Sequence, residues 1–255
     1  MIITDTHTHL YSEAFEADRK AMVQRAIDAH VSRFFIPAID STYTASMLQL
    51  QKDFPDHIFL MMGLHPTHVK ENFKDELKHV EKMLAQQKFY AVGEIGIDLY
   101  WDKSTLNIQI EAFKHQIHLA KTYGLPIVIH CRDAFDEIFE VLEQEKSEDL
   151  HGIFHCFTGT IEQAHKAISY NMKLGIGGVV TFKNGKIDQF INQISLEHLV
   201  LETDAPYLAP KPYRGQRNES VYIHKVLEKL FELYNMSKEE IATITTENSK
   251  LVFGI

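Results

Sequence analysis

Two histidines stand two residues apart near the start of the chain, His7 and His9. They closely follow an apolar run over residues 2–4, which predicts a short buried strand. Residues two apart on a strand point to the same side, so both imidazoles can bind one metal ion. Taken alone, such a pair is better explained by chance or by two hydrogen-bonded polar side chains. A metal site therefore needs further ligands elsewhere in the chain.

Four further metal-binding side chains follow later apolar runs, and they are Glu94, His130, His155 and Asp204. Each has an ordinary explanation by itself, such as a hydrogen-bonded buried histidine or an Asx turn around Asp204. Glu94 is the most informative, because a carboxylate at the end of an apolar strand is costly to desolvate unless a cation or a proton pairs with it. The shared position of these residues after apolar runs is what indicates a metal site.

The elements that must position these side chains recur along the chain as a short apolar run followed by a longer amphipathic stretch. The apolar runs cover residues 2–4, 33–37, 58–62, 90–92, 126–129, 152–154, 172–176 and 199–201. Helical spacing is found over residues 15–29, 76–86, 105–122, 135–144, 161–169, 220–234 and 238–253. Eight such runs predict a parallel sheet closed into a (β/α)8 TIM-like barrel, with residues 1–255 as one domain. No G-x-G-x-x-G follows the first run, which excludes an open dinucleotide-binding sheet.

In a barrel of this kind, functional residues lie at the C-terminal ends of the strands. The six ligand-type residues then open on one face and are too many for one tetrahedral site, so we expect two metal ions. We assign His7, His9 and Asp204 to one ion and His130 and His155 to the other, with Glu94 bridging. Mg²⁺, Mn²⁺ and Zn²⁺ all stay open, because ligand type alone does not identify the metal. Cys131 directly follows His130, points to the other side of its strand and is predicted to pack in the core.

Composition limits the classes of partner. The chain has 255 residues, of which 45% are hydrophobic and 24% charged, and a net charge of −9 without a basic block. These values indicate a globular protein that does not hold long duplex nucleic acid through phosphate contacts. The apolar runs are too short to cross a bilayer, and no signal-peptide pattern is visible in the first residues, so we expect none. Two cysteines suit a reducing compartment, so we expect a cytoplasmic protein without a membrane or an obligate protein partner.

In several motifs the sequence resembles the TatD-type metal-dependent deoxyribonucleases of the amidohydrolase-like superfamily. The motifs span nearly the whole chain, and they are Asp5-Thr-His-Thr-His-Leu, Gly63-Leu-His-Pro, Gly93-Glu-Ile-Gly-Ile-Asp98, His130-Cys-Arg-Asp133, His155-Cys-Phe-Thr-Gly159, Glu202-Thr-Asp-Ala-Pro-Tyr207, and Pro212-Tyr-Arg-Gly215 with Asn218-Glu. The resemblance implies a TIM-like barrel, two divalent ions and hydrolysis of phosphodiesters, often 3′-to-5′ on DNA. Related hydrolases carry a carboxylated lysine where this chain has Glu94, which favours the nuclease branch. Ser220 departs from the proline of many relatives, and we interpret it as a helix cap.

Substrate contacts are predicted from the loops on the same face. Glu94 and Asp204 are the expected catalytic residues, with Asp204 accepting the proton of the attacking water. His65 is expected to touch the site beside a substrate phosphate, as are the basic residues of neighbouring loops. The remaining candidates are Arg132, Lys211 and Arg214 for phosphates, and Tyr207, Tyr213 and Tyr222 for base stacking.

Three other interpretations stay open. The same scaffold serves hydrolysis of a small lactone, ester or amide, because activated water attacks carbonyl and phosphoryl centres alike. A binding protein with purely structural metals would tolerate replacement of Glu94. A nuclease could also prefer RNA, damaged DNA or short phosphoesters, and the negative net charge favours nucleic-acid ends or short oligonucleotides over long duplex.

Overall fold

The strands of the computed structural model, which describes residues 2–255, follow one another in chain order and pair only in parallel. They are β1 (Ile3–Asp5), β2 (Val31–Ile36), β3 (Ile58–Leu60), β4 (Val92–Asp98), β5 (Ile127–Arg132), β6 (Gly152–Phe154), β7 (Met172–Ile176) and β8 (Leu199–Leu201). Regular ladders join β1 to β3 and β4 to β8. A bridge between Met62 and Val92 connects the two sheets, and the amide of Thr6 donates to the carbonyl of Leu201 at 3.0 Å across β1 and β8. The strands thus form the expected TIM-like barrel.

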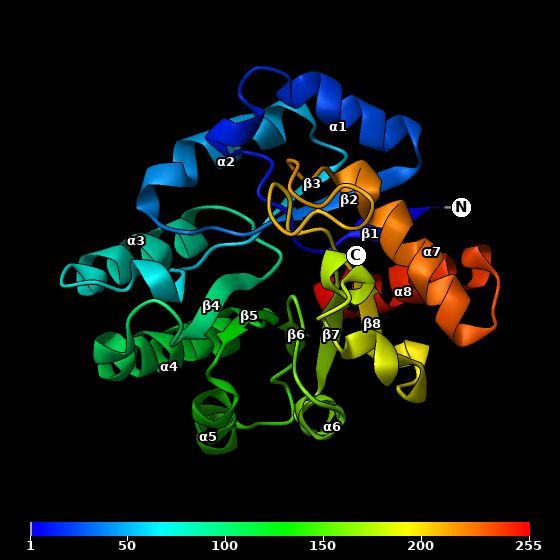
Figure 1. Cartoon of the computed structure of the whole chain (residues 1–255). Helices are drawn as coiled ribbons and strands as arrows, with labels where there is room; N and C mark the ends of the chain where they lie inside the picture. Colours follow the sequence, from blue (N-terminus) through cyan, green and yellow to red (C-terminus); the bar gives the residue numbers. More distant parts are fainter. Residues whose placement is uncertain (1) are drawn as a thin grey trace.

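Helices surround these strands (Figure 1). They are α1 (Arg19–Asp28), α2 (Thr44–Asp53), α3 (Phe73–Gln86), α4 (Leu106–Tyr123), α5 (Phe135–Glu145), α6 (Ile161–Ser169), α7 (Ile223–Tyr234) and α8 (Lys238–Phe253). Each buries an apolar face, as α3 does with Leu77, Val80 and Leu84. Short 3-10 turns replace an α-helix between β7 and β8. None of the helices within residues 2–255 is both long and apolar enough to cross a bilayer.

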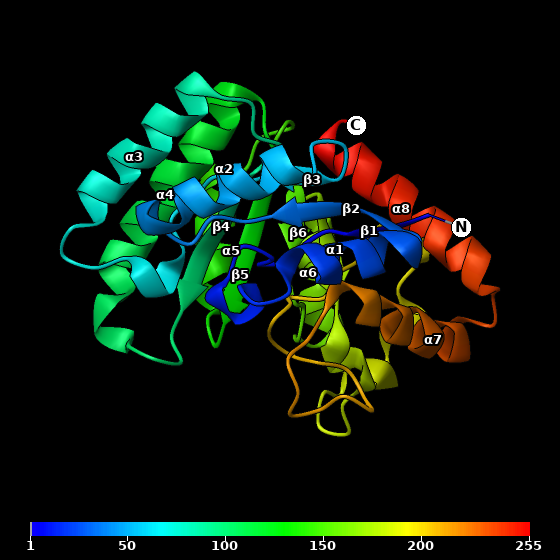
Figure 2. The same ribbon diagram turned by 90° about the horizontal axis from the view of Figure 1, so that it is seen from above.

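A small core inside the ring of strands separates its two ends. Phe35, Val128, Ile153 and Val200 belong to one apolar cluster, although they come from strands on different sides of the ring. Phe253 at the end of α8 stacks on Phe35, with ring centroids 3.6 Å apart. Figure 2 shows this end of α8 (red) and the loop after β8 (orange) on opposite sides of the strands. Residues two positions further along β5 and β6 therefore face the end that is away from α8.

The predicted bounds were wrong at β4 and β5. β4 was expected over residues 90–92, but it continues to Asp98, so that Glu94 lies inside the strand instead of after it. The glycines of β4 interrupt the apolar pattern by which a strand is recognised in the sequence. They allow close packing against β5, because a Cβ on Gly96 would lie 2.1 Å from the carbonyl oxygen of His130. β5 likewise extends from the expected end at residue 129 to Arg132.

Three helix starts and one cap also differ from the prediction, and α3, which was predicted from residue 76, begins at Phe73. The stretch predicted over residues 15–29 becomes helical only at Arg19, and the one over residues 220–234 begins with a 3-10 turn before Ile223. Ser220 is not a helix cap, because its hydroxyl donates to the buried Oδ2 of Asp5 at 2.6 Å. By contrast, Ser237 and Glu240 form the capping box that starts α8.

Candidate metal centre

Glu94 lies at the centre of the polar cluster at the C-terminal ends of the strands. Its carboxylate is 2% exposed and reaches five imidazoles that come from the ends of four different strands or the loops that follow them. The distances to its oxygens are 3.1 Å from His7 Nε2, 3.7 Å from His9 Nε2, 3.2 Å from His65 Nε2, 2.8 Å from His130 Nδ1 and 3.0 Å from His155 Nε2. The side chains that the sequence separates by up to 148 positions, from His7 to His155, thus converge on one carboxylate.

Asp204 closes the cluster from the loop after β8. Its Oδ1 lies 3.4 Å from His9 Nε2 and 3.8 Å from His7 Nε2. The backbone of Asp204 is left-handed, with φ of 56°, and its amide donates to the carbonyl of His7 at 2.9 Å. The preceding Thr203 donates to the buried Asp5 through both its amide and its hydroxyl, at 3.0 and 2.6 Å. These bonds hold the loop against β1 and bring Asp204 to the histidine pair.

Three residues that sequence reasoning missed orient the histidines. Asp98 Oδ2 lies 2.8 Å from His130 Nε2, and Glu202 Oε1 lies 3.4 Å from His155 Nδ1. The hydroxyl of Tyr11 lies 2.9 Å from His9 Nδ1. A partner on the second ring nitrogen fixes the tautomer and rotation of a metal-binding histidine. Asp98 was missed because the strand was predicted to end at Val92, although Gly96 pairs with His130 and Asp98 stands two residues further on the same side.

The buried polar atoms fit a metal site better than they fit one another. Within residues 2–255, neither ring nitrogen of His7 has a hydrogen-bond partner, and the same holds for Glu94 Oε2. Leaving such atoms unsatisfied costs about 1–3 kcal/mol each in a folded protein. Three sets of ligand atoms lie within 4.8 Å of one another, namely His7, His155 and Asp204; His7, His9 and Glu94; and His65, Glu94 and His130. Imidazoles with carboxylates suit Zn²⁺, Mn²⁺ and similar ions, so the residues present fit the group.

The pKa values show which of these groups are ready to bind a cation. Burial opposes charge on Glu94, but the imidazoles of His155, His65 and His7 outweigh it and hold its pKa well below the usual value. Burial likewise opposes charge on Asp204, whose pKa is nevertheless lowered by the bond to His9 and by nearby imidazoles. Burial lowers the pKa of His7 and lowers that of His65 to about 4. Two carboxylates and two neutral imidazoles are therefore present at neutral pH, as metal binding requires.

The cluster opens into a pocket of about 550 Å³, a volume typical of small-ligand sites. Of the predicted substrate contacts, His65, Arg132 and Tyr207 line this pocket. Arg214 does not line it, because its guanidinium stacks on Phe182 at 3.8 Å. Tyr213 and Tyr222 stack on each other instead, with centroids 4.0 Å apart. The exposed Trp101, which was not predicted as a site residue, also lines the pocket.

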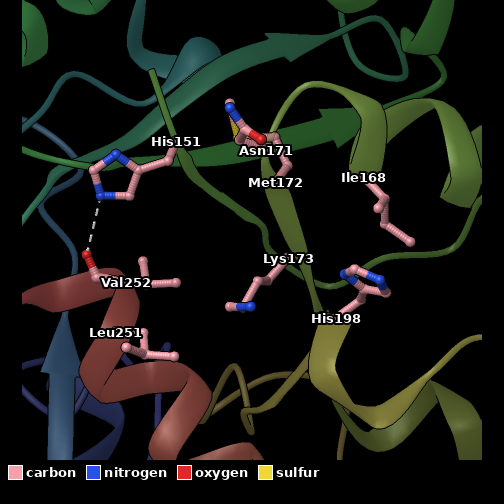
Figure 3. Close-up of a pocket in the computed structure, with 8 residues that line it drawn as sticks. All are labelled: His151, Ile168, Asn171, Met172, Lys173, His198, Leu251 and Val252. Carbon is pink, nitrogen blue, oxygen red and sulfur yellow. Dashed lines mark hydrogen bonds between the residues drawn. The ribbon is translucent and has the colours of Figure 1, made fainter. Parts of the chain in front are cut away.

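A smaller hollow of about 310 Å³ lies at the opposite end of the strands. Figure 3 shows His151, Lys173 and His198 around it, beside Leu251 and Val252 of α8. Lys173 Nζ donates to the carbonyl of Glu197 at 2.7 Å, and His151 Nε2 lies 3.3 Å from the carbonyl of Val252. Its lining holds no predicted site residue and no carboxylate, unlike the pocket around Glu94.

Comparison with known proteins places this fold and cluster in one class. The TatD related DNase family model matches residues 4–254. The metal-dependent hydrolase YabD of Bacillus subtilis is 39% identical over all of both chains, and the metal-dependent hydrolase TatD of Mycobacterium tuberculosis is 32% identical over 99% of this chain and 98% of its own. The crystal structure of YjjV, a TatD homologue from Escherichia coli, superposes with a TM-score of 0.93 at 30% identity, covering 99% of this chain and 98% of that one.

Barrel and cluster therefore define a metal-dependent hydrolase. More narrowly, the chain belongs to the TatD related DNase family, as its motifs indicated.

Proposed function

We propose that the chain hydrolyses phosphodiester bonds at nucleic-acid ends, as a 3′-to-5′ exodeoxyribonuclease on single-stranded DNA that uses two divalent metal ions. The observation that carries the proposal is that one buried carboxylate, Glu94, lies within 3.7 Å of five imidazoles and is flanked by Asp204. One carboxylate with histidines on both of its oxygens is suited to bridge two ions. A nuclease family and a pocket open to solvent agree with a phosphodiester substrate.

The expected ligands can be assigned to two ions. His7, His9 and Asp204 would hold one ion, His130 and His155 the other, and Glu94 both. His65, whose Nε2 lies 3.2 Å from a Glu94 oxygen, stands close enough to be a ligand or to hold a substrate phosphate. The chemistry that a pair of divalent ions supplies is neutralisation of phosphate charge and a more acidic water.

The chain's own groups complete the reaction. Asp204, 13% exposed, faces the pocket and accepts the proton of the water whose oxygen attacks phosphorus. The bond from phosphorus to the leaving 3′ oxygen breaks, and that oxygen is protonated by water. Arg132 binds the phosphate through N–H groups that make no hydrogen bond or ion pair elsewhere in residues 2–255. Asp98 and Glu202 keep His130 and His155 in their binding tautomers.

The test is hydrolysis of end-labelled single-stranded DNA and RNA with Mg²⁺, Mn²⁺ or Zn²⁺. We expect a ladder that shortens from the 3′ end, and we expect Glu94→Gln and Asp204→Asn to abolish it. Glu81→Gln is a matched control, because Glu81 also contacts a histidine, His115 Nε2 at 2.7 Å, but on the surface.

Equal cleavage by wild type and both site variants would refute the proposal. So would release of product from small lactones or amides without action on any nucleic acid, which would move the substrate to the carbonyl class.

A further inference from the structure

The loop after β4 exposes aromatic rings beside the metal centre. Trp101, the only tryptophan of the chain, is 71% exposed, and the neighbouring Tyr100 is 54% exposed. Leaving so much apolar ring surface in water is unfavourable, and neighbouring exposed aromatic side chains often mark a binding surface. Trp101 lines the same pocket as Glu94 and His130, so the rings border the site itself.

The rings are held in place and are joined to the metal centre. They meet edge to face, with centroids 4.9 Å apart. The amides of Tyr100 and Trp101 donate to Asp98 Oδ1 at 3.0 and 3.4 Å. The other oxygen of Asp98 lies 2.8 Å from His130 Nε2. One carboxylate therefore fixes both the aromatic loop and a predicted metal ligand, which sets the distance between them.

The positively charged side chain of Arg132 lies against these two rings. The guanidinium of Arg132 lies 3.7 Å from the centroid of the Tyr100 ring and 5.7 Å from that of Trp101. Arg132 and His130 are two residues apart on β5 and point to the same side. Flat π faces next to a guanidinium match an unpaired base together with its phosphate, because every base offers a face for stacking and every phosphate accepts from arginine. An aliphatic or small polar substrate would make little use of them.

We propose that Trp101, Tyr100 and Arg132 form a stacking platform that binds an unpaired nucleobase next to the scissile phosphate. The inference rests on the proposed function and deepens it, since it assigns the substrate an unpaired end. Tyr207, 53% exposed on the loop after β8, lines the same pocket from across the ring and borders the space left for the strand.

Binding is tested first, on the full-length protein with Mn²⁺ and a phosphorothioate-linked oligothymidylate that resists hydrolysis. Because Trp101 is the only indole, its emission reports directly on the platform. We expect saturable quenching, and an affinity, measured by anisotropy of the labelled oligonucleotide, that falls about tenfold in Trp101→Ala. Trp101→Phe keeps a stacking face and should stay within about threefold of wild type. Tyr123→Ala removes an aromatic that is 41% exposed away from the pocket and should change nothing.

Cleavage is tested second, with two substrates that differ only at the 3′ end, one normal and one carrying abasic nucleotides. We expect Trp101→Ala to raise KM for the normal end about tenfold at nearly unchanged kcat, and to leave the abasic end unaffected. A variant that binds and cleaves the normal end like wild type would overturn the platform while leaving the nuclease proposal intact. If wild type cleaves no nucleic acid, the proposed function fails, but saturable quenching of Trp101 in wild type together with an about tenfold lower anisotropy affinity in Trp101→Ala still decides for the platform, whereas an unchanged affinity decides against it.

Discussion

Two clusters of charge in this protein are built in opposite ways. On the surface, Asp18 and Glu219 alternate with Arg25 and Arg217, and each charge meets an opposite one at 2.7–3.3 Å. In the metal centre, Glu94 and Asp204 meet only imidazoles, and several buried nitrogen and oxygen atoms have no hydrogen-bond partner within residues 2–255.

The difference shows what each cluster is for. The surface cluster satisfies its charges within the fold and ties the segment before α7 to the start of α1. The candidate metal centre leaves ligand atoms unsatisfied, which is a cost to the folded state that a bound cation would remove. We therefore expect stability and function to be supported by different sets of charges, and four predictions test that separation.

The largest effect is expected from Glu94→Gln. Its loss of charge should lower activity by at least about 10³-fold, because the shared carboxylate is needed by both predicted ions. The protein without metal should still fold, because an amide of the same shape fills the space of the carboxylate, although it loses the attraction to the imidazoles that lowers the pKa of Glu94. Calorimetry and activity on the same preparations check this, and a strongly destabilised variant would mean that Glu94 serves the fold.

Metal binding should stabilise the protein in proportion to its occupancy. At a hundredfold excess over the dissociation constant, one bound ion adds about 2.7 kcal/mol. For a chain of this size that raises the melting temperature by roughly 5–10 °C. Titration of the chelator-treated protein with Mn²⁺ or Zn²⁺ measures the shift. An equal shift in Glu94→Gln would place the ion elsewhere.

Smaller effects are expected from the carboxylates behind the histidines. Asp98→Asn and Glu202→Gln should each weaken metal affinity about 10- to 100-fold, because His130 and His155 lose the acceptor that fixes their tautomer. Isothermal titration with Zn²⁺ provides the measurement, with Glu81→Gln as the surface control. Unchanged affinity in both variants would show that neither carboxylate positions a ligand.

Arg217→Ala should have the smallest effect, a loss of about 1 kcal/mol in unfolding free energy at neutral pH without a change in activity. Its hydrogen bonds hold the pKa of Asp18 at about 2, below the ordinary 3.8. A depressed carboxyl pKa stabilises the fold above the ordinary value and loses that contribution as pH falls toward 2. Urea unfolding at pH 7 and at acidic pH should show the difference between wild type and variant shrinking below about pH 4. A difference that does not depend on pH would attribute the loss to packing of Arg217 on Phe15.

Much of the fold was predictable because apolar runs and helical spacing are local signals. The bounds of β6, β7, β8, α6 and α8 agree with the prediction. β4 was cut short because glycines and carboxylates interrupt its apolar pattern, and these residues are there for a close approach to β5 and for the site. Ser220 was misinterpreted because helix caps are local, whereas its true partner, Asp5, lies 215 positions away.

The sequence by itself determined the class of chemistry: six ligand-type residues in a fixed order, each close to the end of an apolar run, in a chain with too little basic charge for long duplex. Only the tertiary structure decided how they meet, with five imidazoles on the oxygens of Glu94, Asp98 and Glu202 behind two of them, and Trp101 exposed at the rim. The reason is physical. Residue type and periodicity are written along the chain, but which side chains share a cavity depends on strand register, bulges and loop backbone, which form only when distant strands pair.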